Sequence, residues 1–447
     1  MAIPVVEGTP TTFADAANTT SRVILNPLSS AIGEWLQLGI TMDGGAASFA
    51  PPAEFTVVFE RALGGGAYFW LGKRLVDGTE PVSYTIGSAS ESGTGICFRV
   101  SGCDGTDCVD ILSSCDYVSG AGGEMCCPEA YAECDNSLIL HWGGSDDGTV
   151  TLTKPAGDTT IAGGALSGNA SGTETIVSSL GQASAGYTTF AFIDNSEPGE
   201  ESIGITIVLR STSTPAAYPA QPVRRCCSIS TSELTVALTY PLPFGTVDGD
   251  TLLLVQESDT TGILVNPGSA FTSIDDTSNT SIWAHALYKI ASSEGASFTG
   301  STTTSSSKQG YMRRIVNADT STPINQHSVA TGTSTSMLAS TITPSVNNCL
   351  LYYVGAADDD DLAFNTGYPS GYTGIFSAHS TEGGDCSFII AGNTQTSAAA
   401  TGPVAGSLSA SEEWIAFNIS IQPEGGGGFT AVNRRTLGPR VGSRSIY

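Results

Sequence analysis

The feature that most constrains this chain is a long internal repeat. Four stretches of the first half recur in the second half, in the same order and about 212 to 215 residues later. Each stretch is short, apolar or alternating in polarity, and follows a turn residue, as β-strands do. The matched pairs are residues 32–40 with 247–255, 74–85 with 289–299, 136–143 with 348–355, and 201–209 with 413–421. Their order predicts two tandem copies of one β-rich module.

The composition favours an all-β fold. Charged residues make up only 13% of the chain, and there are 53 glycines. In the last matched stretch the apolar residues Ile415, Phe417 and Ile419 alternate with Ala416 and Asn418, as expected for a sheet with one buried and one wet face. The expected fold class is therefore all-β, with two tandem homologous β-sandwich domains of jelly-roll or Ig-like type and extended N- and C-terminal arms.

The repeat also sets the expected domain boundaries. Each copy has roughly 190 residues and is large enough to bury a core of its own. The Pro-rich joint between the copies is expected to be semi-rigid. We expect an N-terminal arm at 1–20, a first sandwich at 21–212 with a Cys-rich loop at 97–134, a linker at 213–231, a second sandwich at 232–423, and a Gly hinge with a basic tail at 424–447.

Strands are most clearly predicted in the second copy. Apolar runs or period-two alternation mark residues 251–255, 282–290, 311–316, 349–354, 387–390 and 414–421. Residues 300–307 and 331–336 are rich in Ser and Thr instead. We expect these two stretches to be loops or solvated edge strands.

The charge balance is strongly acidic, with a formal net charge of −26. Binding of nucleic acid depends on Lys and Arg that neutralise phosphates, so we expect no nucleic-acid partner. The N-terminus has no basic and apolar leader, and the longest apolar runs are far too short to cross a bilayer. The sequence predicts a protein that is made in the cytoplasm and has no membrane partner.

Seven of the eleven cysteines lie in one Gly- and Asp-rich segment that the second copy lacks. A segment with so little apolar content is usually held by disulfides, and we expect disulfides here. A metal site is the alternative, but no C-x-x-C pair is present. Spacing does not fix the pairing, and the odd total leaves one thiol over. The disulfide candidates are Cys97, Cys103, Cys108, Cys115, Cys126, Cys127, Cys134, Cys226, Cys227, Cys349 and Cys386.

The last residues of the chain have the composition of a docking peptide. They follow a run of glycines, contain several arginines and apolar side chains, and include no acid. Because the rest of the chain is acidic, a neighbouring copy is a suitable surface for them. The candidate docking residues are Phe429, Arg434, Arg435, Leu437, Arg440, Arg444 and Tyr447.

The sequence contains none of the common catalytic or nucleotide-binding motifs, so we expect no enzymatic activity and no cofactor. His141 and His285 fall inside strand patterns, where a hydrogen-bonded lining role is commoner than catalysis. Two acidic clusters each follow a strand and offer the hard oxygen ligands that Ca²⁺ prefers, although solvated turns are the favoured interpretation. These weak Ca²⁺ candidates are Asp146, Asp147, Asp358 and Asp359; no other metal site is expected.

The matched motifs resemble a β-sandwich module of tailed-bacteriophage virion proteins. The resemblance rests on an acidic Gly turn before an apolar strand, an aromatic strand ending in Lys or Arg, and an Asn-led apolar strand. It covers nearly all of both copies, and the Cys-rich loop departs from it.

This resemblance implies a structural virion component of capsid-decoration or tail-fibre type that is exposed after host lysis. It implies other virion proteins and copies of the same chain as partners, and it transfers no catalytic residues. The alternative is a receptor- or glycan-binding tail-fibre or adhesin module. Such a module would contact a host-surface glycan through Trp70, Trp283 and Tyr352.

Overall fold

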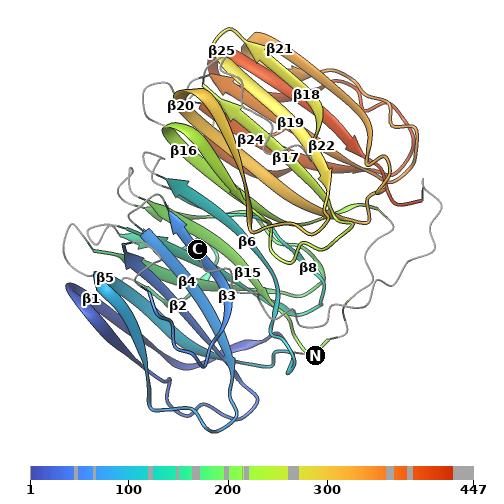
Figure 1. Cartoon of the computed structure of the whole chain (residues 1–447). Coiled ribbons are helices and arrows are strands. Elements are labelled where there is room, and N and C mark those ends of the chain that lie inside the picture. Colours follow the sequence, from blue (N-terminus) through green and yellow to red (C-terminus); the bar gives the residue numbers. More distant parts are fainter. Residues whose placement is uncertain are drawn as a thin grey trace.

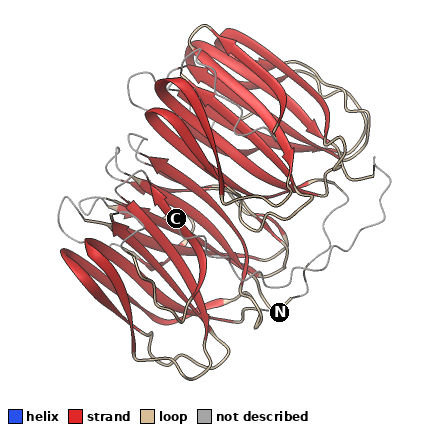
Figure 2. Ribbon diagram, viewed as in Figure 1, coloured by secondary structure: helices blue, strands red, loops and turns tan. Residues whose placement is uncertain are grey.

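The computed structural model of the chain consists of β-strands and connecting loops (Figure 2). The all-β prediction is confirmed. The part of the chain that the structure describes has no helix that is long and apolar enough to cross a membrane. It comprises residues 2–44, 49–63, 67–118, 124–146, 151–163, 172–195, 201–213, 215, 221–259, 271–358, 367–379 and 386–425.

The strands form four five-stranded units with one topology. In each unit the hydrogen-bonded neighbours are the first, fifth, second, fourth and third strands in chain order. Unit 1 contains β1 (Val5–Leu25), β2 (Trp35–Asp43), β3 (Thr56–Leu63), β4 (Ala67–Leu75) and β5 (Ser83–Ser101). Unit 2 contains β6 (Val109–Val118), β9 (Ser137–Ser145), β11 (Thr159–Ala162), β12 (Glu174–Gln182) and β15 (Ser202–Leu209).

The second half of the chain repeats this order. Unit 3 contains β16 (Val223–Pro241), β17 (Thr251–Ser258), β18 (Thr272–Asn279), β19 (Ile282–Ile290) and β20 (Ser297–Val316). Unit 4 contains β21 (Ile324–Ala339), β22 (Cys349–Asp358), β23 (Thr373–His379), β24 (Cys386–Gln395) and β25 (Val404–Ile421). Unit 2 carries additional short strands: β7 (Glu124–Cys127), β8 (Tyr131–Ala132), β10 (Leu152–Thr153), β13 (Gly186–Tyr187) and β14 (Ala191–Asn195).

Units 1 and 2 pack face to face as the first sandwich. Trp35, Phe69 and Phe98 of unit 1 share a buried cluster with Trp142 of unit 2. The ring planes of Phe98 and Trp142 lie 26° apart, with centroids separated by 6.1 Å. A Cβ atom at Gly39 would come within 1.7 Å of the Trp142 ring, so glycine is required where the two sheets meet this closely.

The outer face of the unit 1 sheet is covered by its own long strands. In unit 1, β1 and β5 extend beyond β2 and contain register shifts, for example between Asp15 and Thr19, and such bulges bend a ribbon. As a result Tyr84 and Ile86 of β5 pack in one cluster with Trp70 and Leu38. The apolar residues of β2 are therefore buried on both faces, as its burial pattern shows.

The sheets of units 2 and 3 join edge to edge. The first strands of these units, β6 and β16, pair in parallel from Ser228 with Ser114 to Ser232 with Val118. The result is one ten-stranded sheet that runs through both halves of the chain, with β6 and β16 at the border of the two bodies in Figure 1. The core between units 3 and 4 also includes Met125 and Ile193 of the first half.

The sequence repeat is reproduced in polar contacts. The Arg99–Glu34 ion pair of unit 1, at 3.0 Å, corresponds to Arg314–Asp250 in unit 3, at 2.7 Å. Likewise Arg74–Glu80, at 3.5 Å, corresponds to Lys289–Glu294, at 2.6 Å.

The last matched stretches of the two copies, 201–209 and 413–421, each begin with a carboxylate that links the two sheets of a sandwich. Glu201 accepts a hydrogen bond from the Ala67 amide at 2.8 Å, and Glu413 accepts one from the Ser281 amide at 3.0 Å. Equivalent acids therefore connect unit 2 to unit 1 and unit 4 to unit 3.

The structure moves two of the expected boundaries. Residues 5–20, expected in an arm, belong to β1 and pair with β5. Residues 223–231, expected in the linker, belong to β16. Both stretches are first strands of their units, and Thr- and Ser-rich sequence concealed their alternation. The six predicted strands of the second copy all fall within strands of units 3 and 4. The division into separate domains stays a prediction.

Candidate functional site

The joint between the two halves concentrates buried charge. Glu129, between β7 and β8, is 1% exposed and receives two arginines of unit 3. Arg224 Nε lies 2.7 Å from Glu129 Oε1, and Arg313 Nη2 lies 2.8 Å from the same oxygen. The Arg224 guanidinium also stacks over the Tyr187 ring, 4.1 Å from its centroid. Removing one member of such a buried network leaves the others without charge compensation, at a cost of roughly 3–5 kcal/mol.

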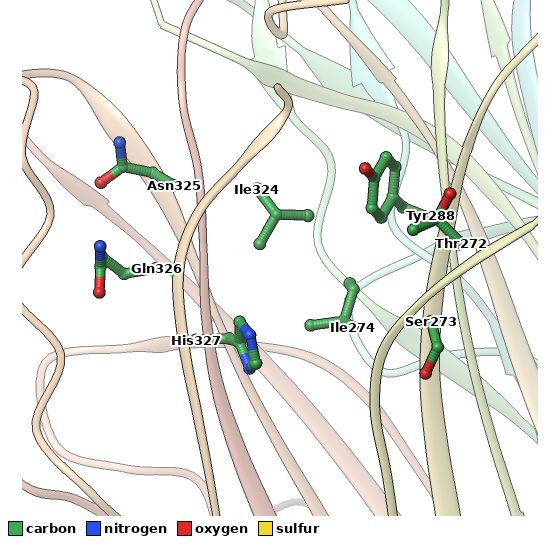
Figure 3. A pocket seen from close by; sticks show the side chains of 8 residues that line it. All are labelled: Thr272, Ser273, Ile274, Tyr288, Ile324, Asn325, Gln326 and His327. Atoms are coloured by element: carbon green, nitrogen blue, oxygen red, sulfur yellow. The ribbon is translucent and has the colours of Figure 1, made fainter. Parts of the chain in front are cut away.

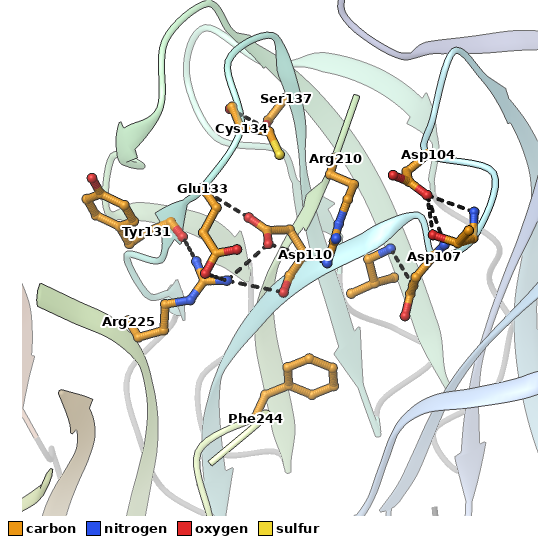
Figure 4. Close-up of polar contacts among 12 residues, drawn as sticks. Asp104, Asp107, Asp110, Tyr131, Glu133, Cys134, Ser137, Arg210, Arg225 and Phe244 are labelled. Carbon is orange, nitrogen blue, oxygen red and sulfur yellow. Dashed lines mark hydrogen bonds and ion pairs between the residues drawn. The ribbon is translucent and has the colours of Figure 1, made fainter. Parts of the chain in front are cut away.

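The next arginine of β16 makes a second buried cluster (Figure 4). Arg225 lies 3.0 Å from Asp110 and 3.0 Å from Glu133 and donates a hydrogen bond to the Tyr131 carbonyl oxygen. Arg210 lies 3.7 Å from Asp110. Two consecutive residues of unit 3 therefore bind two different acidic groups of unit 2. This arrangement fixes the register in which the two halves meet.

Sequence reasoning missed both clusters. The only indication in the sequence was that Arg224 and Arg225 are adjacent cations in a chain with few cations and lie next to a Pro-rich joint. Their acidic partners are separated from them by 95 and 115 residues. No local pattern connects residues over such a distance.

The expected disulfides are absent from the structure. All eleven cysteines lie in the described residues, are buried and are not joined in disulfides. Cys115, Cys126, Cys127 and Cys227 lie together in the core that also contains the sheets of units 3 and 4. The second half therefore covers this part of the Cys-rich segment. Its thiols pack as small apolar groups, and burial raises the pKa of Cys227 to about 12.

The calcium candidates and the tail are only partly within the described residues. Asp146 directly follows β9 and its amide donates to the Glu201 carbonyl oxygen at 2.9 Å, while Asp358 pairs with Cys386 in the β22–β24 ladder. Asp147, Asp359 and the docking tail lie outside the described residues. Within the described ranges no group of three or more His, Cys, Asp or Glu side chains is arranged to hold a metal ion.

His141 belongs to a buried polar group in unit 2. Its Nδ1 lies 2.7 Å from Asp158 Oδ2, and Ser178 Oγ donates to the same oxygen at 2.6 Å. Serine, histidine and aspartate are the residue types of a hydrolase triad, but here the serine contacts the acid and not the imidazole. His141 is 1% exposed. These hydrogen bonds therefore connect β9 and β12 to the residue before β11, and the described group presents no nucleophile to solvent.

A surface groove lies between the edge strands of units 3 and 4. Its volume is about 380 Å³, and its lining includes Ile274 and Tyr288 from unit 3 and Ile324, Gln326 and His327 from unit 4. Figure 3 shows Ile274, Ile324 and Tyr288 around the space, with Gln326 at one side.

Two histidines of the second half, His285 and His327, lie at or next to this groove. His327 Nδ1 is 3.3 Å from Asp275, and His285 Nε2 is 2.9 Å from Ser273 Oγ. His285 itself is buried, which agrees with the lining role expected from its strand pattern.

The three aromatic residues expected to contact glycans are buried. Trp70 and Tyr352 are 0% exposed and Trp283 is 3% exposed. They fill the cores of units 1, 4 and 3 because they stand on strands, where alternate side chains face inward. This corrects their assignment as sugar-contacting residues.

Comparison with known protein families, with curated proteins and with solved structures found no match to this chain.

Proposed function

We propose that this protein is a non-enzymatic structural subunit that joins a larger assembly through its terminal segments. The observation that carries the proposal is the continuous ten-stranded sheet, which makes one body of both halves. The buried ion pairs of Arg224 with Glu129 and of Arg225 with Asp110 add to the rigidity of this joint. A body of this kind sets a fixed distance between attachment points.

The composition of residues 425–447 supports attachment through the C-terminal segment. This segment combines four arginines with Phe429, Leu437 and Tyr447 and contains no acid, whereas the whole chain has a net charge of −26. Opposite charges favour encounter and set the orientation of a complex. The resemblance to tailed-phage virion modules is the reason for proposing a virion, as capsid decoration or tail fibre, as the assembly.

The test removes the segment and then supplies it separately. We expect a chain lacking residues 425–447 to stay folded and to be absent from purified particles. A synthetic peptide of residues 425–447 should bind the shortened chain with an affinity that falls as salt rises, because exposed charges are screened. The matched control peptide replaces the four arginines with glutamine and should bind weakly. Normal incorporation of the shortened chain into particles would contradict the docking role.

The groove between β18 and β21 supports a second candidate function, binding of a host-surface glycan. Sugar rings place their C–H faces on aromatic and aliphatic side chains and their hydroxyls on polar ones, and the groove is lined by Tyr288 as well as by Gln326 and His327. A glycan array probed with the intact protein and with Tyr288→Ala tests this function. Binding that the variant loses supports it, and an array without any bound glycan argues against it.

A further inference from the structure

One buried polar group in the second sandwich has no part in the joint or the groove. It lies between the sheets of units 3 and 4, where Glu257 of β17 is the direct cross-strand neighbour of Gln309 of β20. Cys386, the first residue of β24, faces them from the opposite sheet. Glu257 and Cys386 are 0% exposed, and Gln309 is 1% exposed.

Gln309 is held against Cys386. Its Nε2 donates a hydrogen bond to the Cys386 carbonyl oxygen at 2.8 Å and lies 3.9 Å from the Cys386 sulfur. The carboxamide carbon is one bond from that nitrogen. The amide oxygen of Gln309 is buried and has no hydrogen-bond partner among the described residues. A buried amide that leaves its oxygen unpaired is costly and calls for an explanation.

Glu257 supplies an acid at the same place. Its carboxyl lies beside the Cys386 thiol, and neither carboxyl oxygen has a nitrogen or oxygen partner in the described part of the chain. Burial raises the pKa of Glu257 well above its usual value, although the contact with Cys386 opposes this. Burial therefore favours the neutral carboxyl, which can exchange a proton with a neighbouring group.

The first sandwich has a group of threonines at the place where the second sandwich has Glu257, Gln309 and Cys386. Thr41 of β2 and Thr94 of β5 are cross-strand neighbours at the positions of Glu257 and Gln309, and each hydroxyl lies 2.7 Å from that of Thr175 of β12. The Thr94 hydroxyl also lies 3.1 Å from that of Thr173, which holds the position of Cys386. Hydroxyls satisfy one another there with no unpaired oxygen on Thr41, Thr94 or Thr175. A thiol, an amide and a carboxyl in the same layer of the second sandwich are therefore not required by the fold.

We propose that Cys386 and Gln309 join in an internal thioester that links the sheets of units 3 and 4. The Cys386 sulfur attacks the carboxamide carbon of Gln309, the carbon–sulfur bond forms, and the carbon–nitrogen bond breaks. The amide nitrogen leaves as ammonia and takes the thiol proton, which Glu257 relays. No oxidant or reductant is needed, because neither sulfur nor carbon changes oxidation state. Burial keeps water away from the product, which would otherwise hydrolyse.

Intact mass spectrometry in acid tests the proposal on the full-length protein. We expect the wild-type chain to be lighter than its sequence by one ammonia, and Cys386→Ser to have its full sequence mass. The matched control is Cys349→Ser, which removes another buried thiol of unit 4 and should keep the loss of ammonia. Acid proteolysis should release one species in which the peptides of Gln309 and Cys386 are joined.

Reaction with methylamine and substitution of Glu257 test the thioester further. Methylamine added to the unfolded wild-type protein should restore a thiol at Cys386 and add one methylamine to residue 309. A wild-type mass equal to that of the sequence would overturn the proposal, whatever the stability of the variants. In Glu257→Gln we expect a smaller fraction of chains to lose ammonia, and an unchanged fraction would remove Glu257 from the reaction.

Discussion

Asp158 illustrates how a single buried acid is kept charged in this protein. Burial by itself would raise the pKa of Asp158, but the hydrogen bond and charge of His141 and the hydrogen bond from Ser178 outweigh it, so the pKa lies below its usual value. A lowered pKa means that the folded state favours the ionised form. The stabilising contribution is therefore complete above about pH 4, the ordinary pKa of an aspartate, and is lost as pH falls through the folded pKa.

We expect Asp158→Asn to remove this pH-dependent contribution. At pH 7 the variant should be less stable by roughly 1–3 kcal/mol, since it loses hydrogen bonds to a charged acceptor in the interior. Between pH 5 and 2 its unfolding midpoint in urea should decline less steeply than that of the wild type. Parallel pH profiles for the two proteins would show that Asp158 does not titrate with folding.

His141 and Asp158 also show how much the sequence can predict about single buried residues. His141 was expected to line a strand because it interrupts an apolar run, and it is a buried lining residue. Asp158 was not expected as its partner, because it lies in a Gly- and Thr-rich stretch with no periodicity. Glu129, Gln309 and Glu257 were missed for a similar reason, since burial of a polar residue is decided by strands far away in the sequence.

At the scale of elements, apolar alternation found the central strands, and the polar stretches were left open; of these, 331–336 lies in β21, the solvated edge strand that was one of the two alternatives. The β22 and β25 strands are apolar and were predicted, whereas residues 300–307 and 331–336 were left open as loops or edge strands. The structure places them in β20 and β21. Ser and Thr stretches can pair there because the ribbon partner supplies the hydrogen bonds and little apolar burial is required. Repeated topology in all four units was not predicted, because only the larger repeat retains similar sequence.

In the Cys-rich segment, β7 packs closely against the backbone of β15. Gly204 of β15 lies under β7, and a Cβ atom there would come within 2.1 Å of the Cys126 carbonyl oxygen. We expect Gly204→Ala to push β7 away from the sheet and to destabilise the protein by about 1–3 kcal/mol, as overpacking usually does. The urea midpoint measured by tryptophan fluorescence reports this change.

Gly105→Ala is the matched control for this prediction. Gly105 lies in the same Cys-rich segment, and an added Cβ atom would meet nothing within 4 Å. Its effect should stay within about 0.5 kcal/mol, as for most surface substitutions. Equal midpoints for the two alanine variants would mean that β7 is free to shift and does not clamp the sheet.

At the scale of the whole molecule, the two copies are coupled more closely than two independent sandwiches would be. The second copy alone would expose β16 as an unpaired edge, and such edges promote association. It would also leave Arg224 and Arg313 without Glu129 and uncover the core that Met125 and Ile193 complete. Length and composition allowed each copy its own core, but the shared sheet could not be foreseen because parallel pairing of β6 with β16 has no sequence signature.

We therefore expect the isolated second half, residues 221–425, to self-associate or to unfold at a lower urea concentration than the intact chain. Size-exclusion chromatography with light scattering gives its oligomeric state, and fluorescence gives its midpoint. Adding the separately produced first half, residues 2–213, should restore a monomeric complex, because it returns β6, Glu129 and Asp110 to β16. A second half that is monomeric and has the same midpoint as the intact chain would instead establish two self-sufficient domains, as the repeat in the sequence suggested.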